Sequence, residues 1–328
     1  MRRRIPAKYI PLAATALVLV ALYTAGCLSY PNFASPRVAV DLLGDNAFLG
    51  VAAIGATFVI LSGGIDLSVG SVVAFTSILI ASLVGEHGVH PLPAIAIALA
   101  VGAALGSAMG CLIHFYRLPP FLVTLAGMFF ARGMGFVVRE QSLGIKHAFY
   151  VEDIIQNLAI PVSRQVSIPF TAVCFVVVFV AGLYVAHYTR FGRTVYAIGG
   201  DEQSARLMGL PIGRTKILIY TCAGLFSALA GVVRTFYMQS GDPASCVGLE
   251  LDAIAAVVIG GTLLSGRVGF VAGTGMGVLI LGLIQTIINF QGNLNTWWTK
   301  IVVGLLVLVF ILLQNVVAAA SGRSGKGG

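Results

Sequence analysis

The chain has 328 residues, of which 58% are hydrophobic and only 10% charged. Soluble domains carry about 25% charged residues, so this composition excludes a water-soluble globular protein and indicates an integral membrane protein. The net charge of +8 is spread over short loops, and it is therefore read as a sign of membrane topology and not of nucleic-acid binding.

Apolar segments of membrane length follow one another along the chain. The first, Ile10 to Leu28, comes after a basic head and predicts a membrane helix, with a cleaved signal peptide as the alternative. Since a bilayer needs roughly 20 apolar residues per helix, further helices are expected near 47–62, 67–84, 92–115, 121–138, 168–187, 216–237, 252–264, 268–290 and 299–317. The sequence thus predicts one all-α, polytopic transmembrane domain over residues 1–328, with about ten helices and a range of about eight to ten.

The basic residues give this arrangement an orientation, because cytoplasmic loops carry an excess of lysine and arginine. With the N-terminus inside, the inside loops contain Arg117, Arg190, Arg193, Arg206, Arg214, Lys216 and Arg267. Most acids fall in the outside loops, among them Glu86, Glu140, Asp242, Glu250 and Asp252. This bias predicts an even number of spans and places both termini in the cytoplasm.

Two of the predicted helices are short, and each ends at a pair of glycines. Residues 47–62 lead into Gly63-Gly64, and residues 252–264 contain Gly260-Gly261. Both sites share the pattern Gly-Gly-x-x-Leu-Ser, which predicts interrupted helices in two halves of a duplicated transporter. A chance match in an apolar sequence of low diversity is the alternative.

The polar residues near these interruptions are candidates for a substrate pathway. The set is Asn46, Ser62, Gly63, Gly64, Asp66, Ser68, Gly260, Gly261 and Ser265. Neutral donors and acceptors suit an uncharged polyol, whereas hydrogen bonding between packed helices is the alternative for each single residue.

Asp66 is the acidic residue of the first interrupted segment. A carboxylate at membrane depth costs about 2.5–3.5 kcal/mol on insertion scales, which marks it as a functional candidate. Two interpretations stay open: it caps the helix that restarts at Leu67, or it contacts a polar substrate or coupling element.

The pair Trp297-Trp298 precedes the last apolar segment and is followed by Lys300. Tryptophan is enriched where membrane meets water. These residues are therefore predicted to anchor the chain at the interface and not to form a surface for a ligand.

The longest inside loop, residues 188–216, is polar and basic. Gly199-Gly200-Asp201 ends one element, Asp201 can cap the next, and Gly209 closes a short helix with the sequence EQSARLMG. Such a segment suits docking into a groove of another protein, and a connector lying on anionic lipid heads is the alternative.

Searches for catalytic motifs find no HExxH, no G-x-S-x-G and no P-loop in the sequence. The chain is therefore expected not to be an enzyme and to bind no cofactor. If transport is driven by ATP, both ATP and Mg²⁺ belong on a separate subunit.

Four stretches resemble the permease subunits of bacterial ABC importers for ribose, xylose, galactose and related sugars. They are DNAFLGVAAIGATFVILSGGIDLSVGSVVAF (45–75), PPFLVTLAGMFFARG (119–133), TRFGRTVYAIGGDEQSARLMG (189–209) and ELDAIAAVVIGGTLLSGRVG (250–269). Within that family, LAGMFFARG, GLELDAIA and NTWWTKI most resemble galactofuranose permeases, which makes galactofuranose the expected sugar.

The resemblance implies a permease in the bacterial inner membrane that works with several partners. These are two ATP-binding subunits, a second permease that is identical or paralogous, and a periplasmic sugar-binding protein. It further implies an ATPase coupling segment made of Gly199, Gly200, Asp201, Glu202, Ala205, Arg206 and Gly209. Gln203 and Ser204 stand where the family pattern has alanines, which puts some docking contacts in doubt.

A secondary, proton-coupled carrier or a passive channel for small polar solutes is the alternative function. Proton-coupled carriers usually have several acids and histidines within the membrane. Here Asp66 is the clear candidate, and His87, His90, His147 and His187 fall in loops or at the ends of helices.

Overall fold

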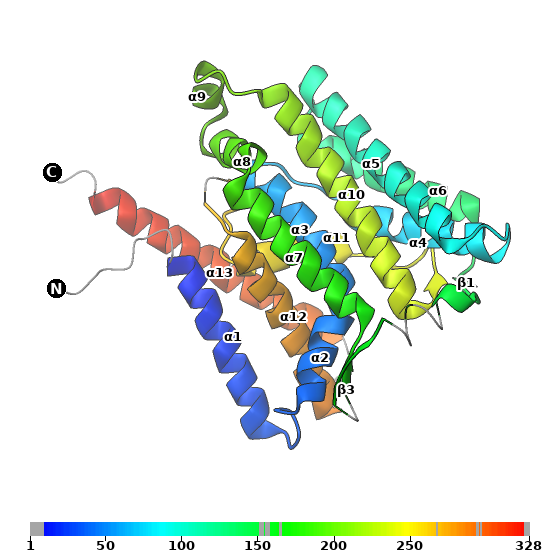
Figure 1. Cartoon of the computed structure of the whole chain (residues 1–328). Coiled ribbons are helices and arrows are strands. Elements are labelled where there is room, and N and C mark those ends of the chain that lie inside the picture. Colours follow the sequence, from blue (N-terminus) through cyan, green and yellow to red (C-terminus); the bar gives the residue numbers. More distant parts are fainter. Residues whose placement is uncertain are drawn as a thin grey trace.

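The computed structural model describes residues 10–150, 154, 158–163, 166–266, 268–292, 295 and 297–324, so Arg267 lies outside the described residues. The chain folds as a helical bundle with short strands at its periphery (Figure 1). The helices are α1 Ile10–Ser29, α2 Pro36–Asp45, α3 Ala47–Leu61, α4 Val69–Gly85, α5 Pro91–Phe115, α6 Pro120–Val138, α7 Phe170–Tyr188, α8 Arg190–Gly200, α9 Glu202–Leu207, α10 Ile212–Met238, α11 Leu249–Ile259, α12 Val271–Gln291 and α13 Trp297–Ser324.

The short strands form two antiparallel pairs. Strand β1 (Leu143–Gly144) pairs with β4 (Ser240–Gly241), and β2 (Ile160–Ser163) pairs with β3 (Val166–Ile168). We call the end of the bundle that carries α8 and α9 the α9 end, and the end that carries β1 and β4 the β4 end (Figure 1).

Each of the ten predicted apolar segments contains a helix, which confirms a polytopic helical membrane protein. In the described part of the chain, six helices are long and apolar enough to cross a membrane, and a seventh span arises if α2 and α3 count as one. The apolar parts of α4, α11 and α13 are shorter than those of these six helices. Helices α3 and α11 are short because each ends at a predicted break.

Helix α2 was not among the predicted segments. It is amphipathic, carrying Arg37 and Asp41, which form an ion pair with an N–O distance of 3.7 Å. The α2–α3 pair bends by 53° at Asn46. A pattern of long apolar segments does not predict α2, because the helix has only ten residues and carries charged side chains.

Helix α3 lies at the centre of the bundle, packed against α7, α10, α11 and α12. Every residue of α3 except Phe48 is buried, which agrees with its uniformly apolar sequence. Helix α10 packs closely on α5, where a Cβ at Gly102 or Gly106 would meet the backbone of α10. Small residues thus permit the backbone contact that membrane helices use for packing.

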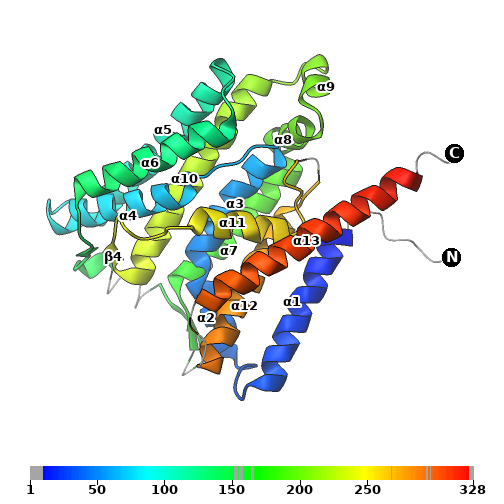
Figure 2. The same ribbon diagram turned by 180° about the vertical axis from the view of Figure 1, so that it is seen from behind.

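Helix α13 crosses α11 and α12 on the other side of the bundle (Figure 2). The start of α1 contacts the second break, since a Cβ at Gly261 would lie 3.0 Å from Cβ of Pro11. Helix α11 is therefore enclosed by α1, α3, α12 and α13 along its short length.

Candidate functional site

The first helix break is a glycine cap at the end of α3. Gly63 has φ +80°, its N–H donates to Ile60 O at 2.9 Å, and the N–H of Gly64 donates to Val59 O at 3.0 Å. This pair of bonds is a Schellman cap, which needs a residue in the left-handed region and therefore favours glycine.

The second break has the same cap at the end of α11. Gly261 has φ +88° and donates to Val258 O at 2.9 Å, while Thr262 donates to Val257 O at 3.2 Å. Gly63 and Gly261 therefore occupy equivalent positions in the two caps. Aligning the two Gly-Gly-x-x-Leu-Ser patterns instead pairs Gly63 with Gly260, so the structural equivalence differs from the sequence alignment by one residue. Gly260 instead packs against the backbone of Gly273 in α12.

Side chains from two other helices bind the last carbonyl groups of α11. Thr15 Oγ1 donates to Ile259 O at 2.6 Å, and Gln314 Nε2 donates to Val258 O at 3.2 Å. Both side chains are buried. Because the last carbonyls of a helix lack partners within it, these bonds fix the second break to α1 and α13.

Asp66 shapes the first break from within. Its Oδ1 accepts bonds from Ser68 N at 2.8 Å and Ser68 Oγ at 2.6 Å, and the side chain is buried. Helix α4 starts at Val69, so Asp66 orders the turn ahead of that helix; the N-cap position itself is Ser68. Its second oxygen has no hydrogen-bond partner among the described residues, and neither has the buried hydroxyl of Tyr220.

The two breaks meet each other and the segment between α7 and α10. Gly266 has φ +76°, and a Cβ there would lie 3.0 Å from Gly63 N, 3.1 Å from Leu61 O and 3.2 Å from Cα of Gly199. A side chain at position 266 would push the backbone of the second break away from the end of α3 and from the end of α8. Gly266 therefore lets both breaks and the end of α8 touch at one point, which we call the break junction.

Two side chains of α8 strengthen this contact. The Tyr196 hydroxyl donates to Gly269 O of the second break at 2.9 Å, and the Phe191 ring lies 5.8 Å from the ring of Phe58 in α3. Helix α8 therefore contacts the segments on both sides of the break junction.

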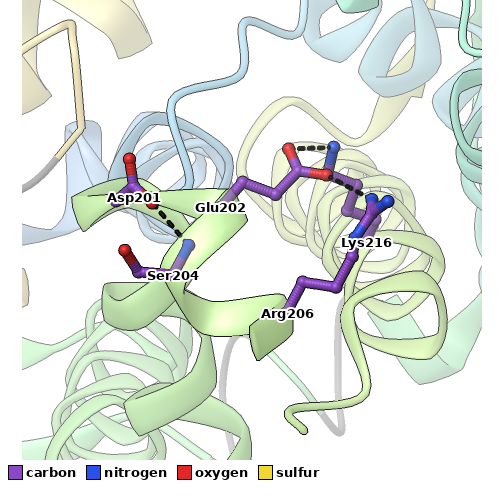
Figure 3. A network of polar contacts seen from close by, with 5 residues as sticks. All are labelled: Asp201, Glu202, Ser204, Arg206 and Lys216. Atoms are coloured by element: carbon purple, nitrogen blue, oxygen red, sulfur yellow. Dashed lines mark hydrogen bonds and ion pairs between the residues drawn. The ribbon is translucent and has the colours of Figure 1, made fainter. Parts of the chain in front are cut away.

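Helix α9 follows α8 directly, as the sequence predicts. Asp201 ends α8 and caps α9, accepting a bond from Ser204 N at 2.5 Å. Glu202 binds Arg206 at 3.3 Å on the same helix and Lys216 of α10 at 2.7 Å (Figure 3). The Lys216 contact ties α9 to the first turn of α10.

The two faces of α9 differ in their surroundings. Ala205 is fully buried with Ile198 and Ile212, whereas Leu207 and Met208 are 87% and 67% exposed. Gly209, with φ +76°, closes the helix. The segment thus presents two large apolar side chains outward from a fixed base.

The candidate residues of the substrate pathway fall into two places. Ser62, Gly63, Gly64, Asp66, Ser68, Gly260, Gly261 and Ser265 lie at the two breaks, where Ser265 O is 3.7 Å from the Cβ position of Gly63. Asn46 instead lies at the opposite end of α3, beside Asp252 and Gln285. Sequence reasoning passed over Tyr196, Gly266, Thr15 and Gln314; their roles depend on contacts between segments distant along the chain.

No group of His, Cys, Asp and Glu suited to a metal ion occurs within the described ranges. Three of the bases predicted to lie inside gather at one end. Arg117, Arg206 and Lys216 line the same cavity at the α9 end, whereas Glu86 pairs with Arg139 near the β4 end.

Comparison with known proteins gives a consistent family. The family described as "Branched-chain amino acid transport system / permease component" matches residues 38–311. The inner membrane ABC transporter permease protein YjfF of Escherichia coli (strain K12) is 50% identical over 93% of this chain and 92% of that protein.

Two further relatives are named for sugars. The fructose import permease protein FruG of Bifidobacterium longum is 36% identical over 95% of this chain and 93% of its own length. The ribose import permease protein RbsC of Escherichia coli (strain K12) is 37% identical over 91% of each chain. No solved structure matches. The chain therefore belongs to the family of ABC importer permeases, as a sugar importer permease of the YjfF type.

Proposed function

We propose that this permease translocates a monosaccharide, with galactofuranose as the expected sugar, by alternating access driven from the segment 188–216. The observation that carries the proposal is the break junction, where Gly199 and Tyr196 of α8 contact the second break and Gly266 of that break meets Gly63 of the first. A force on α9 would reach the breaks through α8 without crossing a mobile linker.

The proposed cycle assigns a part to each segment. Closure of the ATPase subunits moves α9, whose exposed Leu207 and Met208 lie in their groove. Helix α8 passes this movement to the break junction, and α3 and α11 rock about their glycine caps. Rigid-body movement of this kind opens a central path alternately to either side.

The partners follow from the family and are part of the proposal. ABC importer permeases rely on separate ATPase subunits and a substrate-binding protein. We assign ATP and Mg²⁺ to the ATPase, a second identical or paralogous permease to the membrane complex, and sugar delivery to a periplasmic binding protein. The α9 end, where the bases gather, faces the cytoplasm of a bacterial inner membrane, and both termini lie on that side.

Reconstitution tests this proposal. The permease is placed in proteoliposomes with its ATPase, second permease and binding protein, and uptake of radiolabelled galactofuranose, ribose and fructose is measured with ATP enclosed. ATP-dependent uptake of galactofuranose in preference to the other two is the expected result. Uptake of none of the three sugars would contradict the proposal.

A proton-coupled carrier is the second candidate, and Asp66 is the observation that favours it. The same vesicles decide between them. Uptake that needs ATP and persists with a proton ionophore supports the importer, whereas uptake by the permease alone that the ionophore abolishes supports the carrier.

A further inference from the structure

A cavity of about 390 Å³ with a mixed polar and apolar wall lies at the end of the bundle opposite the break junction. The start of α3 contributes Asn46, the first turn of α11 contributes Asp252, and the end of α12 contributes Gln285. Trp297, Thr299 and Lys300 from the start of α13 add polar and aromatic groups, and the rest of the wall is aliphatic, formed by Leu49, Leu281 and Val303.

This cavity differs in chemistry from two others. A cavity of about 510 Å³ between α4, α5 and α6 has an apolar wall that includes Leu105, Met109 and Phe130, which suits acyl chains. The cavity of about 790 Å³ beside α9 contains Glu202 and Arg206 and belongs to the coupling segment. The 390 Å³ cavity falls within the range of about 300–1,000 Å³ typical of small-molecule sites.

The hydrogen-bonding groups in this cavity form two separate pairs, and Gln285 Nε2 also donates one bond to Asn289 Oδ1 at 2.9 Å. Lys300 Nζ donates to Asp252 Oδ1 at 2.7 Å and Oδ2 at 2.5 Å, joining α13 to α11. Thr299 Oγ1 donates to Gln285 Oε1 at 2.8 Å, joining α13 to α12. Carboxylate, ammonium, amide and hydroxyl groups therefore converge on one space from three helices.

The charges of Asp252 and Lys300 offset each other, so the site offers no net attraction for an anion such as a lipid phosphate. A neutral polyol can instead accept a bond from the ammonium group while donating to the carboxylate, and charge-assisted bonds of this kind are the stronger ones. The amide and hydroxyl groups add neutral partners, and the indole of Trp297 adds an apolar face for the C–H side of a sugar ring.

We propose that this cavity is a monosaccharide-binding site, at which Asp252, Lys300 and Gln285 bind sugar hydroxyls and Trp297 contacts the ring. The assignment rests on the proposed function, because sugar transport is what selects a polyol among polar ligands. It revises the role expected for Trp297 and Lys300 from interfacial anchor to ligand contact.

The position of the site connects it to the breaks. Helix α3 runs from Asn46 at the cavity to Gly63 at the break junction, and 15 residues of helix span about 22 Å. Helix α11 likewise runs from Asp252 near the cavity to Gly261 at the second break. Both helices that would move in the transport cycle therefore begin at the sugar site.

Tryptophan fluorescence provides a direct test, because the chain contains two tryptophans. Full-length Trp298→Phe permease in lipid nanodiscs keeps Trp297 as its reporter, and galactofuranose, ribose, fructose and leucine are titrated against it. We expect a saturable change in Trp297 emission with a sugar and none with leucine. Asp252→Asn, made in the same chain, should weaken this response about tenfold through loss of charge-assisted bonds.

Asp41→Asn is the matched control, since it removes the acid of an exposed ion pair with Arg37 and is not one of the residues that line the cavity; it should leave the titration unchanged. If Asp252→Asn does not fold, Gln285→Leu tests the site with the ion pair intact and should also weaken the response. Any of three results would overturn the proposal: equal sugar affinity in the wild-type and variant sites, a response to leucine, or no response to any sugar.

Uptake in the reconstituted importer separates this proposal from the function on which it rests. Absence of ATP-dependent sugar uptake by the wild-type chain would reject the function. Uptake that is present and unchanged in Asp252→Asn and Gln285→Leu would reject the site alone.

Discussion

Asp66 has its clearest role in the shape of the first break. One carboxylate oxygen binds both the backbone and the hydroxyl of Ser68, and a buried group that loses such partners costs about 1–3 kcal/mol. We therefore expect Asp66→Ala to lower the free energy of unfolding by about that amount, and Asp66→Asn, which keeps an acceptor oxygen, to lower it by less than about 1 kcal/mol.

Thermal unfolding in nanodiscs and sugar uptake in proteoliposomes measure the two effects, with Asp41→Asn as the exposed control. We expect Asp66→Asn to retain most of its uptake. A folded Asp66→Asn permease without uptake would show that the charge itself is needed for transport.

Gly266 allows the close approach of three backbone segments. A Cβ at this position would be strained at φ +76° and would press on Gly63, Leu61 and Gly199. Gly266→Ala is expected to reduce sugar uptake strongly. Gly88→Ala is the matched control, since Gly88 has φ +64° but no atom within 4 Å of its Cβ position; equal loss of uptake in both variants would assign the effect to backbone strain alone.

At the scale of elements, α9 is a short helix with an apolar surface pointing outward. Leu207 is 87% exposed, and full burial of a leucine side chain contributes about 1.5–3 kcal/mol. Leu207→Ser should therefore weaken association with the ATPase subunit by at least about tenfold without changing the stability of the permease.

Pull-down of the ATPase by the permease in detergent, titrated with ATPase, measures this association. Leu28→Ser changes a leucine that is 85% exposed at the end of α1 and should have no effect. Wild-type association of Leu207→Ser would show that α9 docks by other side chains.

Among the elements, the long helices and the glycine breaks could be predicted from the sequence, whereas the register of the breaks and helix α2 could not. Long apolar segments predict membrane helices because a bilayer demands their length, and Gly63 and Gly261 predict breaks because a left-handed cap favours glycine. The register of the two breaks was not predictable from a letter pattern, since the φ values select Gly261 and not Gly260 as the partner of Gly63. Helix α2 escaped prediction because its charges interrupt the apolar pattern.

At the scale of the whole molecule, contacts between distant segments connect the coupling segment to the breaks. Tyr196 and Gly269 are 73 positions apart, and no local pattern predicts that they meet. For the same reason Asn46 was grouped with the breaks although it lies at the other end of α3. The bundle thus places the 390 Å³ cavity and the break junction at opposite ends of α3 and α11.

If α8 transmits movement from the ATPase to the breaks, Tyr196→Phe should weaken that transmission. This variant removes the hydroxyl that binds Gly269 O and keeps the ring; one hydrogen bond contributes about 1 kcal/mol, a factor of about five. Tyr184→Phe changes a tyrosine that is 61% exposed on α7, outside the segment 188–216, and serves as the control.

The measurement is the number of sugar molecules taken up per ATP hydrolysed in proteoliposomes that contain the complete importer. We expect this ratio to fall about fivefold in Tyr196→Phe, with ATP hydrolysis maintained, and to stay at the wild-type value in Tyr184→Phe. A wild-type ratio in Tyr196→Phe would contradict the transmission of movement through this contact.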